Sequence, residues 1–146
     1  MNIATNIKQS RHLAEIIPHD SADMTYEKLA IGNNFPEKLQ YRLCLTAFRF
    51  YSGIGVPAWS LSALLELMPI YLKDEDEEYY LVVEKDTYTN GDVIYRVCYN
   101  NCDSLIKLYF EESSTPIEAA YKMVVWLTEN GFITIKENEQ YIQRNG

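Results

Sequence analysis

The chain has few of the residues that mark special classes of protein. Its 146 residues include only three cysteines, six glycines and five prolines. Three cysteines without framework spacing are not typical of a disulfide-stapled secreted domain, so reduced thiols in a cytoplasm are the simplest interpretation. Residues 1–18 contain Lys8, Arg11 and Glu15, which interrupt any signal-peptide-like apolar run. The longest apolar candidates, 56–65 and 123–127, are far shorter than the roughly 18 residues of a membrane span. We therefore predict a cytoplasmic protein without a membrane partner.

Positive charge is also scarce. There are 13 basic and 21 acidic side chains, which gives a net charge of -8. The imbalance lies in residues 61–146, where sixteen acidic side chains outnumber seven basic ones. An acidic protein gains nothing from the counterion release that drives nucleic-acid binding. We therefore predict no direct contact with nucleic acid.

Motifs for metal, cofactor or catalytic chemistry are missing as well. Cys98 and Cys102 form a CxxxC pair, but zinc needs four ligands and both histidines, His12 and His19, are far away in the sequence. The only glycine pair that resembles a phosphate loop, in residues 53–55, lacks the third glycine and the following Lys-Ser/Thr. We predict no metal, no cofactor and no catalytic residue. An enzyme whose site is assembled from scattered residues remains an alternative.

What the chain does have is enough apolar surface for one core, because 47% of its residues are hydrophobic. The sequence predicts a single domain over residues 1–146, with a frayed polar tail at about 137–146. Strands are expected at 79–84, 93–99 and 105–110, and the Asn90-Gly91 pair predicts a hairpin turn between the first two. The five consecutive acids at 74–78 are expected to form a solvated loop before this meander.

Three helices are predicted around the meander. The first runs over 5–17 with Thr5 as its cap, and the second over 60–68 from Ser60. The third begins at Thr115 with a capping box to Glu118 and ends at Gly131. Residues 36–51 fit either a strand or a helix, with the strand slightly favoured, and residues 53–57 are expected to be a loop. The expected class is α+β: an antiparallel meander of three or more strands with about three helices packed on one face.

Three segments carry a resemblance. Residues 56–69 read VPAWSLSALLELMP, residues 118–133 contain EAAYKMVVWL and ENGFI, and residues 10–24 contain SADM at positions 21–24. Together they resemble a group of small uncharacterised proteins common in Bacteroides-type genomes, often associated with prophages or other mobile elements. The resemblance implies an intracellular accessory protein of phage-like origin. It brings no reaction, cofactor or catalytic residue.

The remaining hypothesis is a protein-binding function. The chain would bind either a partner protein or a second copy of itself. Ala119, Met123 and Trp126 form a stripe at i, i+4 and i+7 on the last predicted helix. A second apolar arc of the same helix, centred on Ile117, is expected to pack on the sheet. The stripe then faces away from the sheet, and we predict that it is an interface with Trp126 as its anchor. Core packing of Trp126 is the competing interpretation.

An alternative binding function is mimicry of DNA, in which the acids at 74–78 and their neighbours occupy the groove of a DNA-binding protein. The salt dependence of binding distinguishes the two hypotheses. Salt screens charges and so weakens association through the acids, but it does not weaken association through buried apolar surface. Binding through Trp126 is expected to survive about 0.5 M salt.

Overall fold

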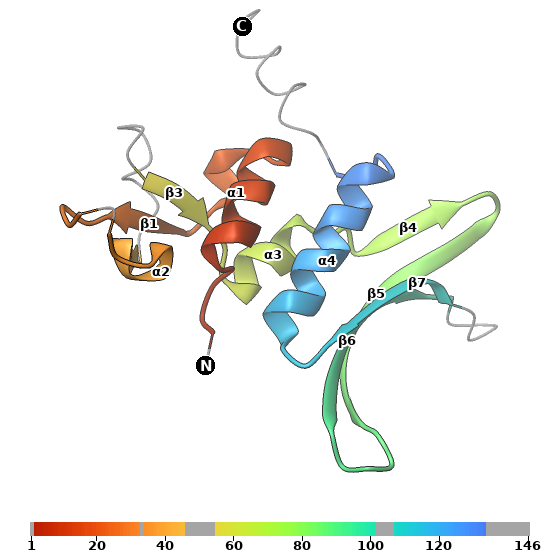
Figure 1. Cartoon of the computed structure of the whole chain (residues 1–146). Helices are drawn as coiled ribbons and strands as arrows, with labels where there is room; N and C mark the ends of the chain where they lie inside the picture. Colours follow the sequence, from red (N-terminus) through yellow and green to blue (C-terminus); the bar gives the residue numbers. More distant parts are fainter. Residues whose placement is uncertain (1, 33, 46–54, 102–106, 134–146) are drawn as a thin grey trace, which may run out of the picture. The chain divides into compact units, whose positions relative to one another are not determined.

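A computed structural model describes residues 2–32, 34–45, 55–101 and 107–133 (Figure 1). Helices and antiparallel sheets occur together, so the predicted α+β class is confirmed. The chain divides into two compact units, one within Met1–Ala63 and the other Leu64–Ile133. The single domain over 1–146 stays a prediction, and its tail at 137–146 lies outside the described residues. None of the helices in the described part of the chain is long and apolar enough to cross a bilayer.

The first unit combines one long helix with a small sheet. Helix α1 (Ile7–Ile16) is followed by the 3-10 turn η1 (His19–Ser21). Three antiparallel strands lie in the order β2-β1-β3. Their bounds are Met24–Lys28 for β1, Tyr41–Cys44 for β2 and Gly55–Ala58 for β3. Helix α1 packs against β3.

The start of α1 corrects one prediction. Asn6, not Thr5, is the cap: its side chain accepts the Gln9 N–H, and the Gln9 side chain accepts the Asn6 N–H. Thr5 is fully buried and serves the core instead. Its Oγ1 accepts the Trp59 N–H at 3.2 Å, and its own N–H donates to the Trp59 carbonyl at 2.9 Å. Both residues are satisfactory caps by type, so only the tertiary contact with Trp59 separates them.

The ambiguous segment 36–51 contains both predicted structures. A single helical turn, α2 (Glu37–Gln40), leads directly into β2. Residues 46–51 lie outside the described residues. The prediction of a loop at 53–57 is wrong from residue 55 onward, because Gly55–Ala58 forms a strand that pairs with β1. Pro57 is compatible with that strand because β3 is at an edge of the sheet.

Helix α3 (Leu61–Leu67) crosses from the first unit into the second. Ser60 caps it as predicted, since its Oγ accepts the Ala63 N–H at 3.2 Å. Ser60 itself is held by Asp23, which accepts hydrogen bonds from both the backbone N–H and the hydroxyl of Ser60.

The second unit contains the predicted meander, with one more strand. Strands β4 (Tyr71–Asp74), β5 (Glu77–Thr87), β6 (Val93–Asn100) and β7 (Lys107–Ser113) pair antiparallel in that order. Gly91 has φ 92° in the β5–β6 turn, which confirms the hairpin expected from Asn90-Gly91. The acids at 74–78 are all exposed, but only Glu75 and Asp76 form the turn; the others extend β4 and β5.

Helix α4 (Pro116–Glu129) follows the predicted bounds closely. The Thr115 hydroxyl accepts the Glu118 N–H at 3.2 Å, and Gly131 has φ 78° after the last turn. The second hydrogen bond of the expected capping box, from the Thr115 N–H to the Glu118 side chain, is replaced. Glu118 accepts a hydrogen bond from the Ser113 hydroxyl instead, and that hydroxyl also accepts the Thr115 N–H.

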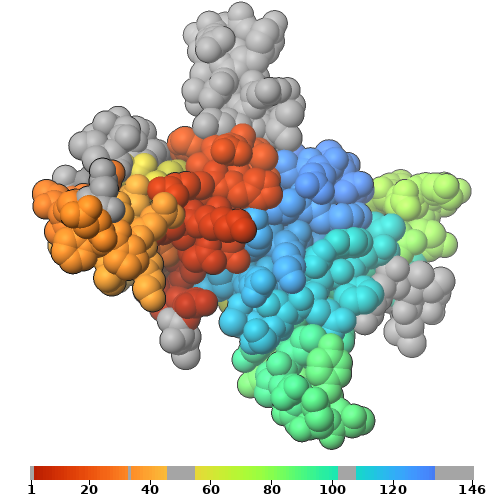
Figure 2. Space-filling view, viewed as in Figure 1, coloured from red at the N-terminus to blue at the C-terminus, as the bar shows by residue number. Residues whose placement is uncertain are grey.

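The four-stranded sheet has two different faces because its side chains alternate. Helix α4 packs on β6 and β7, and Figure 1 shows it next to these strands. Val97 and Tyr99 are on the helix side and are almost fully buried. Arg96 and Cys98 belong to the other face. The end of the β5–β6 hairpin extends beyond α4 (green in Figure 2).

Candidate functional site

No three His, Cys, Asp or Glu side chains among the described residues could together hold a metal ion. Cys98 is buried in β6, where its thiol lies 3.7 Å from the Val82 carbonyl, and Cys102 is outside the described residues. His19 Nε2 lies 2.9 Å from the Ala14 carbonyl. A cavity lined by aromatic and acidic side chains is the candidate site of the second unit.

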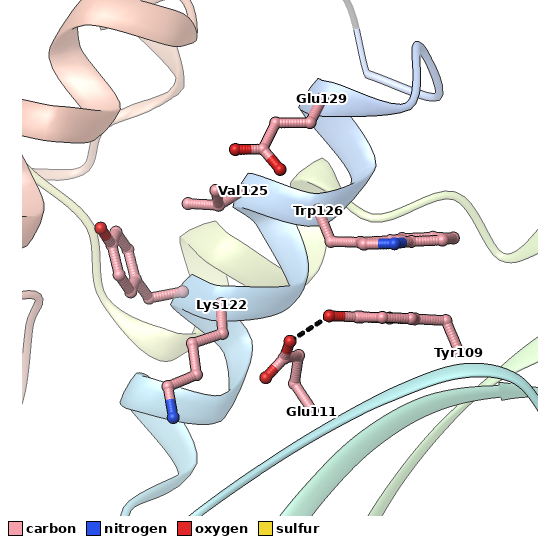
Figure 3. Close-up of a pocket in the computed structure, with 7 residues that line it drawn as sticks. Tyr109, Glu111, Lys122, Val125, Trp126 and Glu129 are labelled. Atoms are coloured by element: carbon pink, nitrogen blue, oxygen red, sulfur yellow. Dashed lines mark hydrogen bonds between the residues drawn. The ribbon is translucent and has the colours of Figure 1, made fainter.

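The aromatic contact between α4 and β7 is the first feature of such a site. The rings of Trp126 and Tyr109 are stacked, with centroids 4.1 Å apart and planes 5° apart (Figure 3). Phe132 packs near the same indole at 5.8 Å. Trp126 lies on the helix side facing the sheet, and Tyr109 on the sheet face that meets the helix. This stack fixes the separation of α4 and β7 at the point where a cavity opens.

That cavity has a volume of about 190 Å³ and is open to solvent. Strand β7 contributes two of its lining residues and α4 contributes five. Tyr109 and Glu111 alternate on the same face of β7, and the helical residues recur at spacings of three and four. The lining residues are Tyr109, Glu111, Tyr121, Lys122, Val125, Trp126 and Glu129.

Two carboxylates give this cavity its charge. Glu111 accepts a hydrogen bond from the Tyr109 hydroxyl (Figure 3). Burial, that hydrogen bond and the negative charges of Glu111 and Glu129 together raise the pKa of Tyr109 to about 12. Burial and then Glu129 also raise the pKa of Tyr121. The charge of Glu129 therefore acts on both phenols, and the cavity disfavours any further negative charge.

Lys122 does not neutralise these acids completely. Its ammonium forms an i, i+4 ion pair with Glu118 at 3.9 Å and donates to the Glu112 carbonyl at 3.4 Å. Figure 3 shows the ammonium end pointing away from Glu129. The part of Lys122 that lines the cavity beside Val125 is therefore its alkyl stem.

The structure places the three predicted interface residues differently from one another. Ala119 and Met123 are fully buried, whereas Trp126 is half-buried at the cavity. The reasoning that directed this stripe away from the sheet is wrong, because Trp126 stacks on Tyr109 of the sheet. The arc centred on Ile117 is buried too. A helical wheel shows two apolar arcs but contains no information on which one meets the sheet.

Sequence reasoning missed most of the cavity. Tyr121, Val125 and Glu129 recur every four residues on α4, which is a recognisable helical stripe. Tyr109 and Glu111 are separated by two, as residues on one strand face must be. Neither pattern shows that β7 and α4 meet, so the acidic and aromatic groups could not be combined from the sequence.

Two other features of the described residues are weaker candidates. A cavity of about 320 Å³ in the first unit is lined by residues including Lys8, Lys38 and Glu37, but Glu37 is already paired with Arg11 at 2.8 Å. On the sheet face opposite α4, Arg96 bonds Glu84 at 2.8 Å and Glu112 at 3.0 Å. These acids are engaged within the sheet, which reduces the negative charge presented there.

No family model, no curated protein and no solved structure matches this chain.

Proposed function

We propose that this chain is a small cytoplasmic accessory protein that acts by binding another protein, and that the cavity between α4 and β7 receives a side chain of that partner. The observation that carries the proposal is the half-buried Trp126 ring at the edge of an open cavity. Tryptophan combines a large apolar area with a rigid shape and is enriched among interface anchors. An adjacent cavity supplies the concave surface that an anchor of the partner needs.

The contact that we propose combines apolar and charged groups. Val125 and the rings of Trp126 and Tyr121 supply apolar surface, while Glu111 and Glu129 supply charge. The expectation of a purely apolar interface is therefore modified, and we expect salt to weaken binding without abolishing it. The cytoplasmic location and the phage-like origin rest on the cysteine usage and on the resemblance of residues 56–69 and 118–133.

Mimicry of DNA is favoured less by the arrangement of the acids. Glu75 and Asp76 are at the β4–β5 turn, while Glu84 and Glu112 are paired with Arg96. A mimic requires carboxylates spread along an open surface at phosphate-like spacing. The exposed acids at 74–78 instead form a short patch at one hairpin.

The proposal is tested with two matched substitutions. Val125→Phe inserts a ring into the cavity, and Val93→Phe adds the same ring at the exposed end of the β5–β6 hairpin. Each variant and the wild type are immobilised and used to capture proteins from a Bacteroides lysate, followed by quantitative mass spectrometry. We expect a partner that is retained by the wild type and by Val93→Phe but lost from Val125→Phe. Circular dichroism checks that all three proteins are folded.

Two outcomes contradict the proposal. If the same partners bind all three proteins equally, the cavity is not the contact. If capture is unaffected by Val125→Phe but is lost with Asp76→Asn and Glu75→Gln together, the acidic hairpin is the binding surface and DNA mimicry is supported.

A further inference from the structure

We infer that the α4–β7 cavity binds an organic cation with an apolar stem, the chemistry that a lysine or arginine side chain presents. This inference rests on the proposed function, since it names the kind of side chain that the cavity receives. It follows from the charge, the walls and the donor set of the cavity.

The charge of the cavity is the first argument. Glu111 and Glu129 come from different elements and line the same space of about 190 Å³. Glu129 makes no hydrogen bond or ion pair with any residue that the structure describes, so its carboxylate is available to a ligand. The one basic lining residue, Lys122, is directed to Glu118 and the Glu112 carbonyl. The cavity therefore has excess negative charge that a cation would balance.

The walls are the second argument. Between the two carboxylates, the lining consists of aromatic rings, Val125 and the alkyl part of Lys122. An alkyl stem can pack against such surface while its charged end reaches a carboxylate, as long basic side chains do at interfaces. Aromatic rings also attract cations through their electron-rich faces.

The donor set distinguishes an organic cation from the other ligand classes. Calcium takes six to eight oxygen ligands, and this cavity offers two carboxylates and phenol oxygens. No group of three acidic, histidine or cysteine side chains suited to a metal occurs among the described residues. An anion would meet Glu111 and Glu129, the same charges that oppose ionisation of Tyr109. An ammonium or guanidinium group is satisfied by one or two carboxylates.

The test is a titration with small probes, followed by ¹H-¹⁵N NMR spectra of the full chain. n-Butylammonium and n-butylguanidinium carry the cation on an alkyl stem, and n-butylurea is the neutral comparison. The indole signals of Trp59 and Trp126 are separate reporters, because Trp59 is fully buried in the other unit. We expect saturable shifts of the Trp126 indole and of α4 and β7 amides with both cations, and none with n-butylurea.

Charge-matched variants complete the test. Glu129→Gln removes one carboxylate of the cavity, and Glu66→Gln removes the same charge from an exposed position on α3. We expect binding of n-butylammonium to weaken about fivefold in Glu129→Gln and to remain unchanged in Glu66→Gln. Glu111→Gln is expected to act in the same direction as Glu129→Gln.

The inference is overturned if n-butylurea binds as well as the cations, or if Glu66→Gln and Glu129→Gln weaken binding equally. Its failure is distinct from failure of the proposed function. Loss of a partner from Val125→Phe, together with no cation binding, would leave the cavity as an interface for a different side chain. If the cations bind but Val125→Phe captures the same partners as the wild type, the cation site is supported and the cavity is not the protein interface.

Discussion

Trp126 of α4 and Tyr109 of β7 lie face to face with their ring centroids 4.1 Å apart, so the predicted interface anchor is also a contact between helix and sheet. Stacked aromatic pairs contribute about 0.5–1.5 kcal/mol beyond the area that they bury. Trp126 therefore has two roles in our proposal, in stability and in forming the edge of the cavity. Any substitution of this residue must be interpreted with both roles in mind.

Trp126→Ala is expected to reduce the free energy of unfolding by about 2–3 kcal/mol, at or below the low end for fully buried tryptophans because this ring is only partly buried. Trp126→Phe keeps one ring over Tyr109 and is expected to lose less. Urea denaturation followed by circular dichroism measures both values. An unchanged stability in Trp126→Ala would mean that the stack does not hold α4 to the sheet.

Arg96 connects three strands, because Glu84 and Glu112 are its register partners on β5 and β7. Only 15% of the Arg96 side chain is exposed, so its removal leaves two carboxylates close together without their cation. We expect Arg96→Ala to destabilise the fold by about 2 kcal/mol. Arg96→Lys is expected to recover only part of this, since one ammonium cannot reproduce the planar fork that reaches both acids.

Lys73→Ala is the matched control for Arg96, because Lys73 is an exposed cation of the same sheet. We expect a change within about 0.5 kcal/mol for this surface substitution. Thermal unfolding of the three variants compares them directly. Equal effects of Arg96→Ala and Lys73→Ala would show that the Arg96 pairs add nothing to stability.

Thr115→Ala is expected to destabilise the protein by about 1 kcal/mol, because the Glu118 N–H loses its acceptor. Ser113→Ala is expected to have a smaller effect in the same direction, since the Ser113 hydroxyl donates to Glu118 and accepts from Thr115. Ser114→Ala changes an exposed neighbour of the same type and serves as the control. Chemical denaturation would contradict the assigned cap if Thr115→Ala and Ser114→Ala were equally stable.

Alkaline pH is expected to destabilise the second unit through Tyr109. The pKa of this phenol is about 12 in the folded protein, above the ordinary value of 10.0. The folded state thus holds its proton more tightly than the unfolded state. The contribution of the protonated Tyr109 phenol to the free energy of unfolding is fully present below about pH 10, and it is lost as the pH rises towards 12.

Unfolding measured in urea at a series of pH values between 9 and 12 tests this expectation, with pH 7 as reference. In Tyr109→Phe the loss of stability with rising pH should be less steep, because that phenol no longer ionises. An identical pH dependence in the wild type and in Tyr109→Phe would show that Tyr109 titrates normally in the folded protein.

Local sequence signals were sufficient for the elements whose ends carry specific residues. Thr115 and Gly131 predicted the ends of α4, and Asn90-Gly91 predicted the β5–β6 hairpin, because a cap or a left-handed turn is chosen by neighbouring residues alone. The same logic was inadequate at Thr5 and Asn6, where both residues can cap a helix. The contact between Thr5 and Trp59, 54 residues apart, decides that Asn6 takes the role.

The amino-acid sequence by itself determined the α+β class, the meander and the bounds of α4, since each depends on periodicity and short-range punctuation. Only the tertiary structure decided which side of α4 meets the sheet, because both apolar arcs of the helix are suited to burial. That choice stacks Trp126 on Tyr109 and brings Glu111 of β7 to the same cavity as Glu129 of α4. Groups that lie 18 residues apart in the chain combine into one site only when strand register and helix orientation are both set.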